Sequence, residues 1–408
     1  MVNYNKFKEY IIDNILNKTI FLAKSIDEVE SLLKYWNLNQ KNIIAVRTSK
    51  KMKQKYKDIY VYELESKERE VSTQNFFRKY LFASGLFNKL IKSVFSKYDL
   101  SLWMFRSYEW CKDLEQINNI KVLLIDHNLY LKLNNKILIL KMFENSDYLS
   151  YHLQIRNNAL KTVYDFNTLS IYDKLIKNYP LPWVVSSQTS DGGNGVFKIE
   201  NFDDFKFALS HINNPIIKIE KFIEDCISVS QHAIIFHDKI IKYQPSLQII
   251  EENNKNLKFM GANYKLAMDD KIKKKLTKLT HFIGNELKKL GYKGIFGCDY
   301  IVKDGEVYFT EINPRFQGST FLLTYNNDVF NPYIMHILSF LYSKEIIEFK
   351  NSIDICENQY IELKSDYYKY KYIFNKEEIK TQHKNKEFRI PFDDIIIKPE
   401  APLGFYIE

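Results

Sequence analysis

The stretch GCDYIVKDGEVYFTEINPRFQGST, residues 297–320, places three oxygen-bearing side chains in two strand-like segments. CDYIV and EVYFTEIN have the composition of β-strands, and KDG between them indicates a hairpin turn. Asp299, Glu311 and Asn313 stand where packed side chains or solvated charges are usual. How the two strands pair decides whether these three residues meet.

Two turns fit the sequence, and they differ in which side chains they bring together. A two-residue Asp-Gly turn would pair Lys303 with Glu306 and place Asp299 and Glu311 on opposite faces. A three-residue loop, Lys303-Asp304-Gly305, with Gly305 left-handed, instead predicts that Asp299, Glu311 and Asn313 share one face. It predicts the same of three apolar residues, Ile301, Val307 and Phe309.

On the second pairing, two carboxylates and an amide oxygen converge with no positive residue directly among them. Like charges so close are costly unless a cation neutralises them. Mg²⁺ prefers oxygen ligands and often shares them with nucleotide phosphates, so Asp299, Glu311 and Asn313 are candidate metal ligands. Arg315, two residues further on, could meet a phosphate. The alternative is an amphipathic hairpin whose acids merely face solvent.

Composition sets limits on the class of protein. A chain of 408 residues suggests two to four domains, and 45% apolar with 27% charged residues argues against disorder. The net charge of +9 is spread among acidic residues, which favours an anionic small ligand over nucleic acid. We expect no zinc knot or disulfide framework, because the cysteines are isolated: Cys111, Cys226, Cys298 and Cys356. No membrane span or signal-peptide core is recognisable, so the expected location is the cytoplasm.

The first 160 residues alternate between strand-like and helix-like segments. Apolar runs at 42–46, 59–64 and 120–133 predict buried strands, and 25–36 and 75–95 predict helices. This alternation indicates an α/β domain with a largely parallel sheet.

From residue 170 the pattern changes to a smaller unit. It predicts a short helix ending near Pro180, then a strand, a glycine-rich loop and a strand over 183–199, and a helix capped by Asn201. An amphipathic helix follows Asp269 or Asp270, one of which should cap it. Beyond about residue 345 we expect short strands, forming either a small β subdomain or a tail wrapped over the rest.

The hairpin resembles the ATP-grasp superfamily, in which an acidic residue is followed, twelve residues later, by Glu-x-Asn-x-Arg. Asp299 and EINPR, residues 311–315, have this separation. The resemblance implies an α/β fold: an N-terminal α/β domain followed by a two-lobed ATP-grasp fold with mostly antiparallel sheets. The implied boundaries are 1–160, 161–222 for a small lid lobe, 223–345 for a large lobe with the metal site, and 346–408.

The resemblance also assigns roles to individual residues, with ATP and Mg²⁺ as cofactors. It implies that Lys174 binds the phosphates. It also implies that Arg315 and Lys174 stabilise the negative charge that develops during phosphoryl transfer. SDGGNGV resembles the loop that covers the phosphates, which includes Ser190, Gly192, Gly193, Asn194 and Gly195. IEKFIED resembles the hinge that contacts adenine and ribose, which includes Glu220, Lys221, Phe222, Ile223 and Glu224. The segment after Asn313 would hold the substrate carboxylate or acylphosphate, through Arg315, Gln317, Gly318, Ser319 and Thr320; Ser319 or Thr320 could instead cap a helix.

One position departs from the family pattern. The strand before the glycine-rich loop usually carries a second phosphate-binding lysine, and here that position falls near Ser186. Either another cation compensates, with Lys198, Lys218 and Lys242 as candidates, or phosphate binding is weaker.

The resemblance implies a carboxylate-amine ligase that joins an amino acid or a peptide to an amine through an acylphosphate, with release of ADP and phosphate. The expected partners are these small molecules, with no nucleic acid and no membrane; a homodimer is left open. The alternatives are a non-catalytic ATP-binding module and an ATP-dependent carboxylase component, although a biotin-carrier motif is absent from the sequence.

Overall fold

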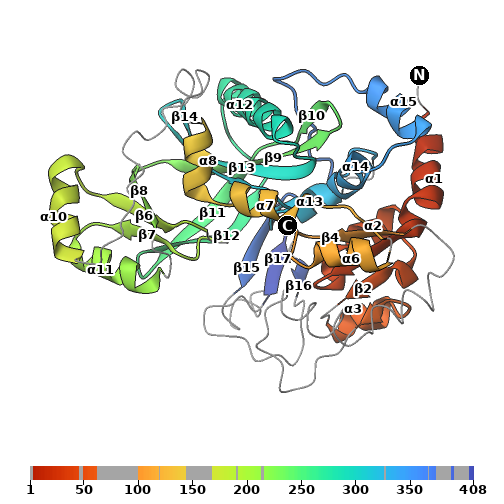
Figure 1. Cartoon of the computed structure of the whole chain (residues 1–408), viewed down its shortest axis with the longest axis horizontal. Helices are drawn as coiled ribbons and strands as arrows, with labels where there is room; N and C mark the ends of the chain where they lie inside the picture. Colours follow the sequence, from red (N-terminus) through yellow and green to blue (C-terminus); the bar gives the residue numbers. More distant parts are fainter. Residues whose placement is uncertain are drawn as a thin grey trace.

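The computed structural model describes residues 3–45, 49–61, 100–118, 120–143, 168–189, 192–212, 216–325, 328–365, 367–373, 387–389 and 404–408. These residues build a five-stranded and a twelve-stranded sheet. Figure 1 shows the N-terminal helices and the smaller sheet at the right of the molecule, and a lobe of strands β6, β7 and β8 with helices α10 and α11 at the left. The predicted helix at 75–95 lies outside the described residues.

The smaller sheet is parallel and has the order β3-β2-β1-β4-β5. Its strands are β1 (Thr19–Ala23), β2 (Ile43–Ala45), β3 (Tyr60–Val61), β4 (Ser101–Met104) and β5 (Lys121–Val122). The helices around it are α1 (Tyr4–Asn14), α2 (Glu30–Tyr35), α3 (Lys50–Lys55) and α6 (Cys111–Asn118). Every residue of β1 and β4 is buried, as is usual for inner strands of a parallel sheet. The predicted α/β domain is confirmed.

The prediction of a single strand over 120–133 is wrong beyond β5. Asp126 caps helix α7 (His127–Leu133), its carboxylate accepting hydrogen bonds from two backbone N–H groups at 2.9 and 3.3 Å. Asn135 then accepts two hydrogen bonds of 3.1 Å at the start of helix α8 (Lys136–Phe143). These two caps outweigh the strand-like composition of the segment.

The larger sheet is antiparallel between its strands, and β14-β13-β9-β11-β12 forms its central part. Its strands here are β9 (Ile227–Phe236), β10 (Lys239–Lys242), β11 (Ser246–Asn253), β12 (Asn256–Asn263), β13 (Gly294–Lys303) and β14 (Glu306–Asn313). Helix α12 (Asp270–Lys289), capped by Asp269, packs on one face. Helices α13 (Thr320–Thr324) and α14 (Pro332–Ser339) pack on the other.

The lid-like lobe has its own small core. Strand β6 (Trp183–Ser187) pairs with β7 (Val196–Ile199) on one side and with β8 (Ile217–Lys221) on the other. Helices α10 (Thr168–Asn178) and α11 (Phe202–His211) contribute to the same core. As predicted, Asn201 caps α11, its side chain accepting a 3.0 Å hydrogen bond from a backbone N–H group.

The segment after residue 345, whose arrangement the sequence left open, extends the large sheet. It begins with helix α15 (Lys344–Ser352), which the prediction of short strands missed. Strands β15 (Lys369–Ile373), β16 (Glu387–Arg389) and β17 (Gly404–Ile407) then continue the sheet beyond β12. The lid strands and these C-terminal strands belong to the same sheet as β9–β14, so the predicted domain boundaries remain a prediction.

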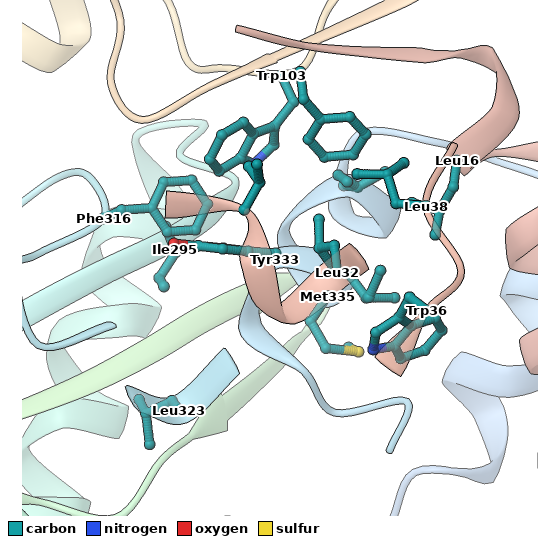
Figure 2. Close-up of a cluster of buried hydrophobic side chains, with 14 of the residues drawn as sticks. Leu16, Leu32, Trp36, Leu38, Trp103, Ile295, Phe316, Leu323, Tyr333 and Met335 are labelled. Carbon is teal, nitrogen blue, oxygen red and sulfur yellow. The ribbon is translucent and has the colours of Figure 1, made fainter. Parts of the chain in front are cut away.

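One apolar core joins the two sheets. Trp103 of β4 lies 5.3 Å from the ring of Phe316 and 5.0 Å from that of Tyr333 on α14. Figure 2 shows these rings together with Trp36 and Met335, from elements far apart in the sequence. All five side chains are almost completely buried. This packing fixes the N-terminal sheet against the segment that follows the hairpin.

None of the helices that the structure describes is long and apolar enough to span a membrane.

Candidate functional site

The hairpin that the sequence singles out is formed by β13 and β14, but its turn is shorter than predicted. Lys303 pairs with Glu306, so only Asp304 and Gly305 lie in the turn. Their φ angles are +51° and +78°, and Asp-Gly is a preferred sequence for a type I′ turn with two positive φ angles. The predicted three-residue loop, Lys303-Asp304-Gly305, is therefore wrong.

A β-bulge in β14 nevertheless brings the polar side chains to one face. The strands pair regularly from the turn as far as Tyr300 opposite Phe309, and the next pair is Asp299 opposite Glu311. Thr310 is the additional residue between them. Because one additional residue reverses the alternation of a strand, Glu311 faces the same side as Asp299. The shared face is present, but the bulge produces it.

The apolar side of the hairpin differs from the prediction at Ile301. The two-residue turn pairs Val307 with Val302, and both pack in the core beneath α12 together with Phe309. Ile301 instead lies opposite Tyr308 and lines the cavity described below. The prediction that Ile301 shares a face with Val307 and Phe309 is thus wrong.

Asp299, Glu311 and Asn313 form a compact group that we call the carboxylate clamp. Asn313 Nδ2 donates to Asp299 Oδ2 at 2.9 Å and to Glu311 Oε1 at 3.3 Å. Asp299 and Asn313 are 7% and 6% exposed, and the Glu311 side chain is 23% exposed, so the two acids share a site that is partly shielded from water. Burial, and then the charge of Glu311, raise the pKa of Asp299 to about 7. The clamp is therefore a place where added positive charge is stabilising.

The donor set of the carboxylate clamp fits a hard divalent cation. It offers the oxygens of two carboxylates and, with the Asn313 amide turned over, one amide oxygen, which suits Mg²⁺ with water and phosphate oxygens completing its coordination. Within the described ranges, no group of three or more His, Cys, Asp or Glu side chains is placed to hold a metal alone.

Gln317 supports the clamp from the segment after β14. Its Nε2 donates to Asp299 Oδ1 at 3.2 Å, and its Oε1 accepts from Ser230 Oγ on β9 at 3.2 Å. A side chain at Gly297 would collide with this amide, so the glycine leaves the space that Gln317 occupies. The orientation of Asp299 is thus set by two strands and the following loop.

Lys136 is a member of this site that the sequence reasoning missed. It lies at the start of α8, and its Nζ is 2.8 Å from Glu311 Oε2, with side-chain exposures of 9% and 23%. Burial acts to raise the pKa of Glu311, but the charge and hydrogen bond of Lys136 lower it overall. The Asn-Asn pair before Lys136 is a helix-cap signal that could have revealed the helix.

The clamp lines a cavity of about 960 Å³ that also includes part of the glycine-rich loop. Gly192, Gly193 and Asn194 line it. Gly193 has a φ of +81°, and a side chain there would collide with a carbonyl of β12, so this position requires glycine. Gly195 is outside the lining; its carbonyl accepts from the end of β6 at 2.9 Å. Ser190 lies outside the described residues.

The predicted hinge contributes three of its five residues to the cavity. Glu220, Phe222 and Ile223 line it, whereas Lys221 and Glu224 are exposed and do not. Glu220 belongs to β8, and the chain leaves that strand after Lys221. The hinge prediction therefore divides into residues that face the cavity and residues that face solvent.

The position near Ser186 is also at the cavity wall. Ser186 is 2% exposed and lies directly opposite Lys218 of β8. Lys218 is 3% exposed, lines the same cavity and pairs with Glu220 at 2.8 Å. The other two candidates for the missing cation, Lys198 and Lys242, are not in the cavity lining.

Lys174, predicted to bind the phosphates, does not reach the site. It is exposed on α10, and the cavity lining does not include it. The helix turns its apolar residues, among them Tyr172 and Leu175, into the lobe's core, so Lys174 is directed to solvent. The prediction of a phosphate-binding role for Lys174 is not supported by this placement.

Four of the five residues predicted to hold the substrate after β14 line the cavity. Arg315, Gln317, Gly318 and Ser319 line the cavity, and Arg315 Nη2 donates to Asn313 Oδ1 at 3.3 Å. Thr320 is buried outside the lining, and its hydroxyl accepts from Gln317 N at 2.8 Å. The Ser319 side chain makes no capping hydrogen bond to α13.

The far end of the cavity reaches the carboxyl ends of β1 and β4, where open α/β sheets often bind ligands. Lys24, Glu28, Arg106 and Tyr108 line this part. Arg106 lies over the ring of Tyr108 at 5.6 Å, and Glu28 accepts from the backbone N–H of Lys24 at 2.7 Å. These residues were not predicted from the sequence, because single charged residues after short strands carry no recognisable motif.

Comparisons with known proteins agree with this geometry. Residues 146–319 match a family model described as an ATP-grasp domain. The arginine-specific large chain of carbamoyl phosphate synthase from Geobacillus stearothermophilus is 47% identical over 38 residues. That match covers 9% of this chain and 4% of the synthase, so this chain corresponds to only a small part of that relative.

Similar solved structures extend over almost the whole chain. Biotin carboxylase from Campylobacter jejuni, in complex with β,γ-ATP, has a TM-score of 0.62 at 13% identity, covering 96% of this chain and 86% of that one. N5-carboxyaminoimidazole synthetase from Staphylococcus aureus, complexed with ADP, has a TM-score of 0.59 at 12% identity, with coverages of 96% and 92%. The biotin carboxylase domain of 2-oxoglutarate carboxylase from Hydrogenobacter thermophilus, with MgADP and bicarbonate, has 0.60 at 11%, with coverages of 96% and 85%. At such identities the similarity establishes the fold.

Proposed function

Because the chain contains an ATP-grasp domain, we propose that it is an ATP- and Mg²⁺-dependent ligase that activates a carboxylate as an acylphosphate and joins it to an amine. ADP and phosphate are the other products. One observation carries the proposal: the glycine-rich loop, the hinge strand and the carboxylate clamp line a single cavity with Arg315. These are the parts that nucleotide binding and phosphoryl transfer need in one place.

The nucleotide end of the cavity runs from the hinge to the clamp. Phe222 and Ile223 line this part of the cavity and would contact adenine, and Gly192 and Gly193 would present backbone N–H groups to the phosphates. Mg²⁺ held by the carboxylate clamp would neutralise the phosphate charge that develops during transfer. Arg315, beside the clamp, would stabilise the negative charge of the transferred group.

The substrate end is the part of the cavity at β1 and β4. Arg106 and Lys24 are suited to the negative groups of a small organic acid, and Glu28 is suited to an amine. Burial raises the pKa of Glu28, which makes this carboxylate a better acceptor for the proton that the amine loses. The presence of both signs of charge favours an amino acid or a short peptide as substrate.

The proposed reaction has two steps. A carboxylate oxygen attacks the γ-phosphorus, the bond to the bridging oxygen breaks, and ADP leaves. The amine then attacks the acyl carbon, phosphate leaves with the bonding electrons, and Glu28 takes the amine proton. No side-chain nucleophile is needed, so the contribution of the protein is positioning and charge stabilisation.

A second candidate is a carboxylase in which bicarbonate is the activated acid. The similarity to biotin carboxylases and to N5-carboxyaminoimidazole synthetase favours it. In that case the charged side chains at the ends of β1 and β4 would bind the amine that receives the carboxyl group. Labelled bicarbonate distinguishes the two candidates, because only the carboxylase incorporates it into product.

The test is turnover by the purified chain with ATP, Mg²⁺ and pools of amino acids and short peptides. The proposal predicts equal amounts of ADP and phosphate that depend on the pool. Release of AMP would indicate adenylation instead. Binding of MgATP without turnover with any pool, with or without bicarbonate, would leave a non-catalytic ATP-binding module as the function.

A further inference from the structure

We propose that Lys218 on β8 binds a nucleotide phosphate in place of the lysine that ATP-grasp domains usually carry at the position of Ser186 on β6. The inference rests on the proposed function, because it assumes that the cavity binds ATP. It assigns a phosphate-binding residue that the family pattern does not contain at this position, and it explains how the cavity can lack a lysine on β6.

The strand register places the two residues side by side. Ser186 is paired with Lys218 across the antiparallel β6–β8 ladder. Residues directly opposite one another have Cβ atoms about 5 Å apart and project to the same face. A lysine on β8 can therefore place its ammonium group in the same part of the cavity as a lysine on β6 would. The serine leaves room for it, since a lysine at both positions would place two ammonium groups together.

The contacts of Lys218 direct its ammonium towards the clamp. Its Nζ lies 2.8 Å from Glu220 Oε2 and donates to the carbonyl of Thr310 at 3.3 Å. Thr310 is the bulge residue of β14 and directly precedes Glu311 of the carboxylate clamp. The ammonium thus bridges the lid strand and the hairpin that would hold Mg²⁺.

The longer of these contacts is the one that a phosphate would replace. An ammonium group has three donors and turns easily between acceptors, whereas the Glu220 pair keeps the buried charge neutralised. A phosphate oxygen near Thr310 would compete only with a neutral carbonyl. Hydrogen bonds from a cation to a phosphate are about twice as strong as bonds between neutral groups.

The other candidate cations have different roles. Lys198 pairs with Glu200 at 2.7 Å and lies over the ring of Phe222, outside the cavity lining. Lys242 is completely buried and donates to the Cys356 carbonyl at 2.8 Å, so it holds the segment after α15. Neither ammonium can reach a ligand in the cavity without breaking these contacts.

The experiment exchanges the two positions. Binding of MgADP and of adenosine is measured by calorimetry for the wild type, Lys218→Met, Lys218→Arg and the double variant Ser186→Lys/Lys218→Ser, with Lys198→Met as the control. We expect Lys218→Met to weaken MgADP binding by about tenfold or more and to change adenosine binding by less than about twofold. Lys218→Arg and the double variant should recover most of the MgADP affinity.

Unchanged adenosine binding shows that the lid of Lys218→Met remains folded. If this variant binds MgADP as tightly as the wild type, or if Lys198→Met weakens binding as much, the inference is wrong. The inference would also be wrong if the double variant Ser186→Lys/Lys218→Ser bound MgADP no more tightly than Lys218→Met. Failure of the wild-type chain to bind MgADP would instead remove the proposed function, and this inference with it.

Discussion

Replacing Lys136 by methionine tests whether the carboxylate clamp is held together by charge. Methionine keeps most of the apolar stem of lysine but removes the ammonium that lies 2.8 Å from Glu311 Oε2. Glu311 would then face the buried carboxylate of Asp299 with its main counter-charge missing. Lys132 is exposed on the neighbouring helix α7, so Lys132→Met is the matched control.

The structure sets the size of the effect. Removing one partner of a buried ion pair typically costs about 3–5 kcal/mol. Since 23% of the Glu311 side chain is exposed, water can recover part of this, and we expect Lys136→Met to cost about 2–3 kcal/mol. Glu311→Gln should cost about as much, because it leaves the ammonium of Lys136 buried. The double variant leaves neither charge unpaired and should cost only about 1 kcal/mol, which corresponds to a coupling of about 3–5 kcal/mol.

The assay is native-state hydrogen exchange of the β13 and β14 amides in buffer without Mg²⁺ or nucleotide. Exchange reports the stability of the hairpin itself, which a single unfolding temperature of a chain with several cores does not. Losses that simply add in the double variant would refute the reasoning. So would an Lys136→Met variant that is as well protected as Lys132→Met.

Three further predictions concern the walls of the cavity. Gly193→Ala should weaken MgADP binding by about tenfold, and more than Gly192→Ala, because only the Gly193 methyl would collide with β12; calorimetry compares the two. Cys226 lines the cavity, whereas Cys356 is exposed elsewhere. Saturating MgADP should therefore slow the alkylation of Cys226 by at least about fivefold and leave that of Cys356 unchanged. Peptide mass spectrometry measures both rates. Arg106→Ala should raise the KM of the carboxylate substrate by about tenfold or more, while the MgADP affinity changes by less than about twofold. Equal effects on both would contradict the division of the cavity into a nucleotide end and a substrate end.

The hairpin shows how far sequence reasoning reached. The spacing of Asp299, Glu311 and Asn313 predicted a shared face, and the structure has one. The reason given was wrong, since an Asp-Gly turn and a bulge at Thr310 replace the predicted loop. Both arrangements add one residue to the same strand pair. The alternation of side chains in the sequence shows that the two strands differ by one residue. It does not show whether that residue lies in the turn or in a bulge.

Two lysines mark the limit of the prediction for the site. Lys174 was selected by position within a resembling segment, but the helical periodicity of α10 turns it away from the cavity. Lys136 was overlooked because it follows the predicted strand at 120–133 in a segment for which nothing was predicted, and only the contact across the fold brings it to Glu311. The sequence around a charged residue does not indicate which distant residue it pairs with. The pair of Lys136 and Glu311 could therefore be found only from the tertiary structure.

The large sheet combines segments that the sequence treated as separate. Local patterns predicted β6, β7 and β13 well, because each strand lies between clear turn residues. Whether the C-terminal strands formed their own unit could not be predicted, since strand pairing over long sequence separations depends on side-chain packing. Gly261 illustrates this dependence, because a side chain there would collide with the backbone of β15.

The central claim is that the cavity transfers a phosphoryl group from ATP to a carboxylate. The most direct measurement is transfer of ¹⁸O from a pool of ¹⁸O-labelled carboxylates to phosphate during turnover with MgATP. An acylphosphate intermediate predicts phosphate that carries one ¹⁸O atom for each ADP formed, with the other ¹⁸O atom of the acid retained in the product. Unlabelled phosphate released together with ADP, or label recovered in AMP, would contradict the account.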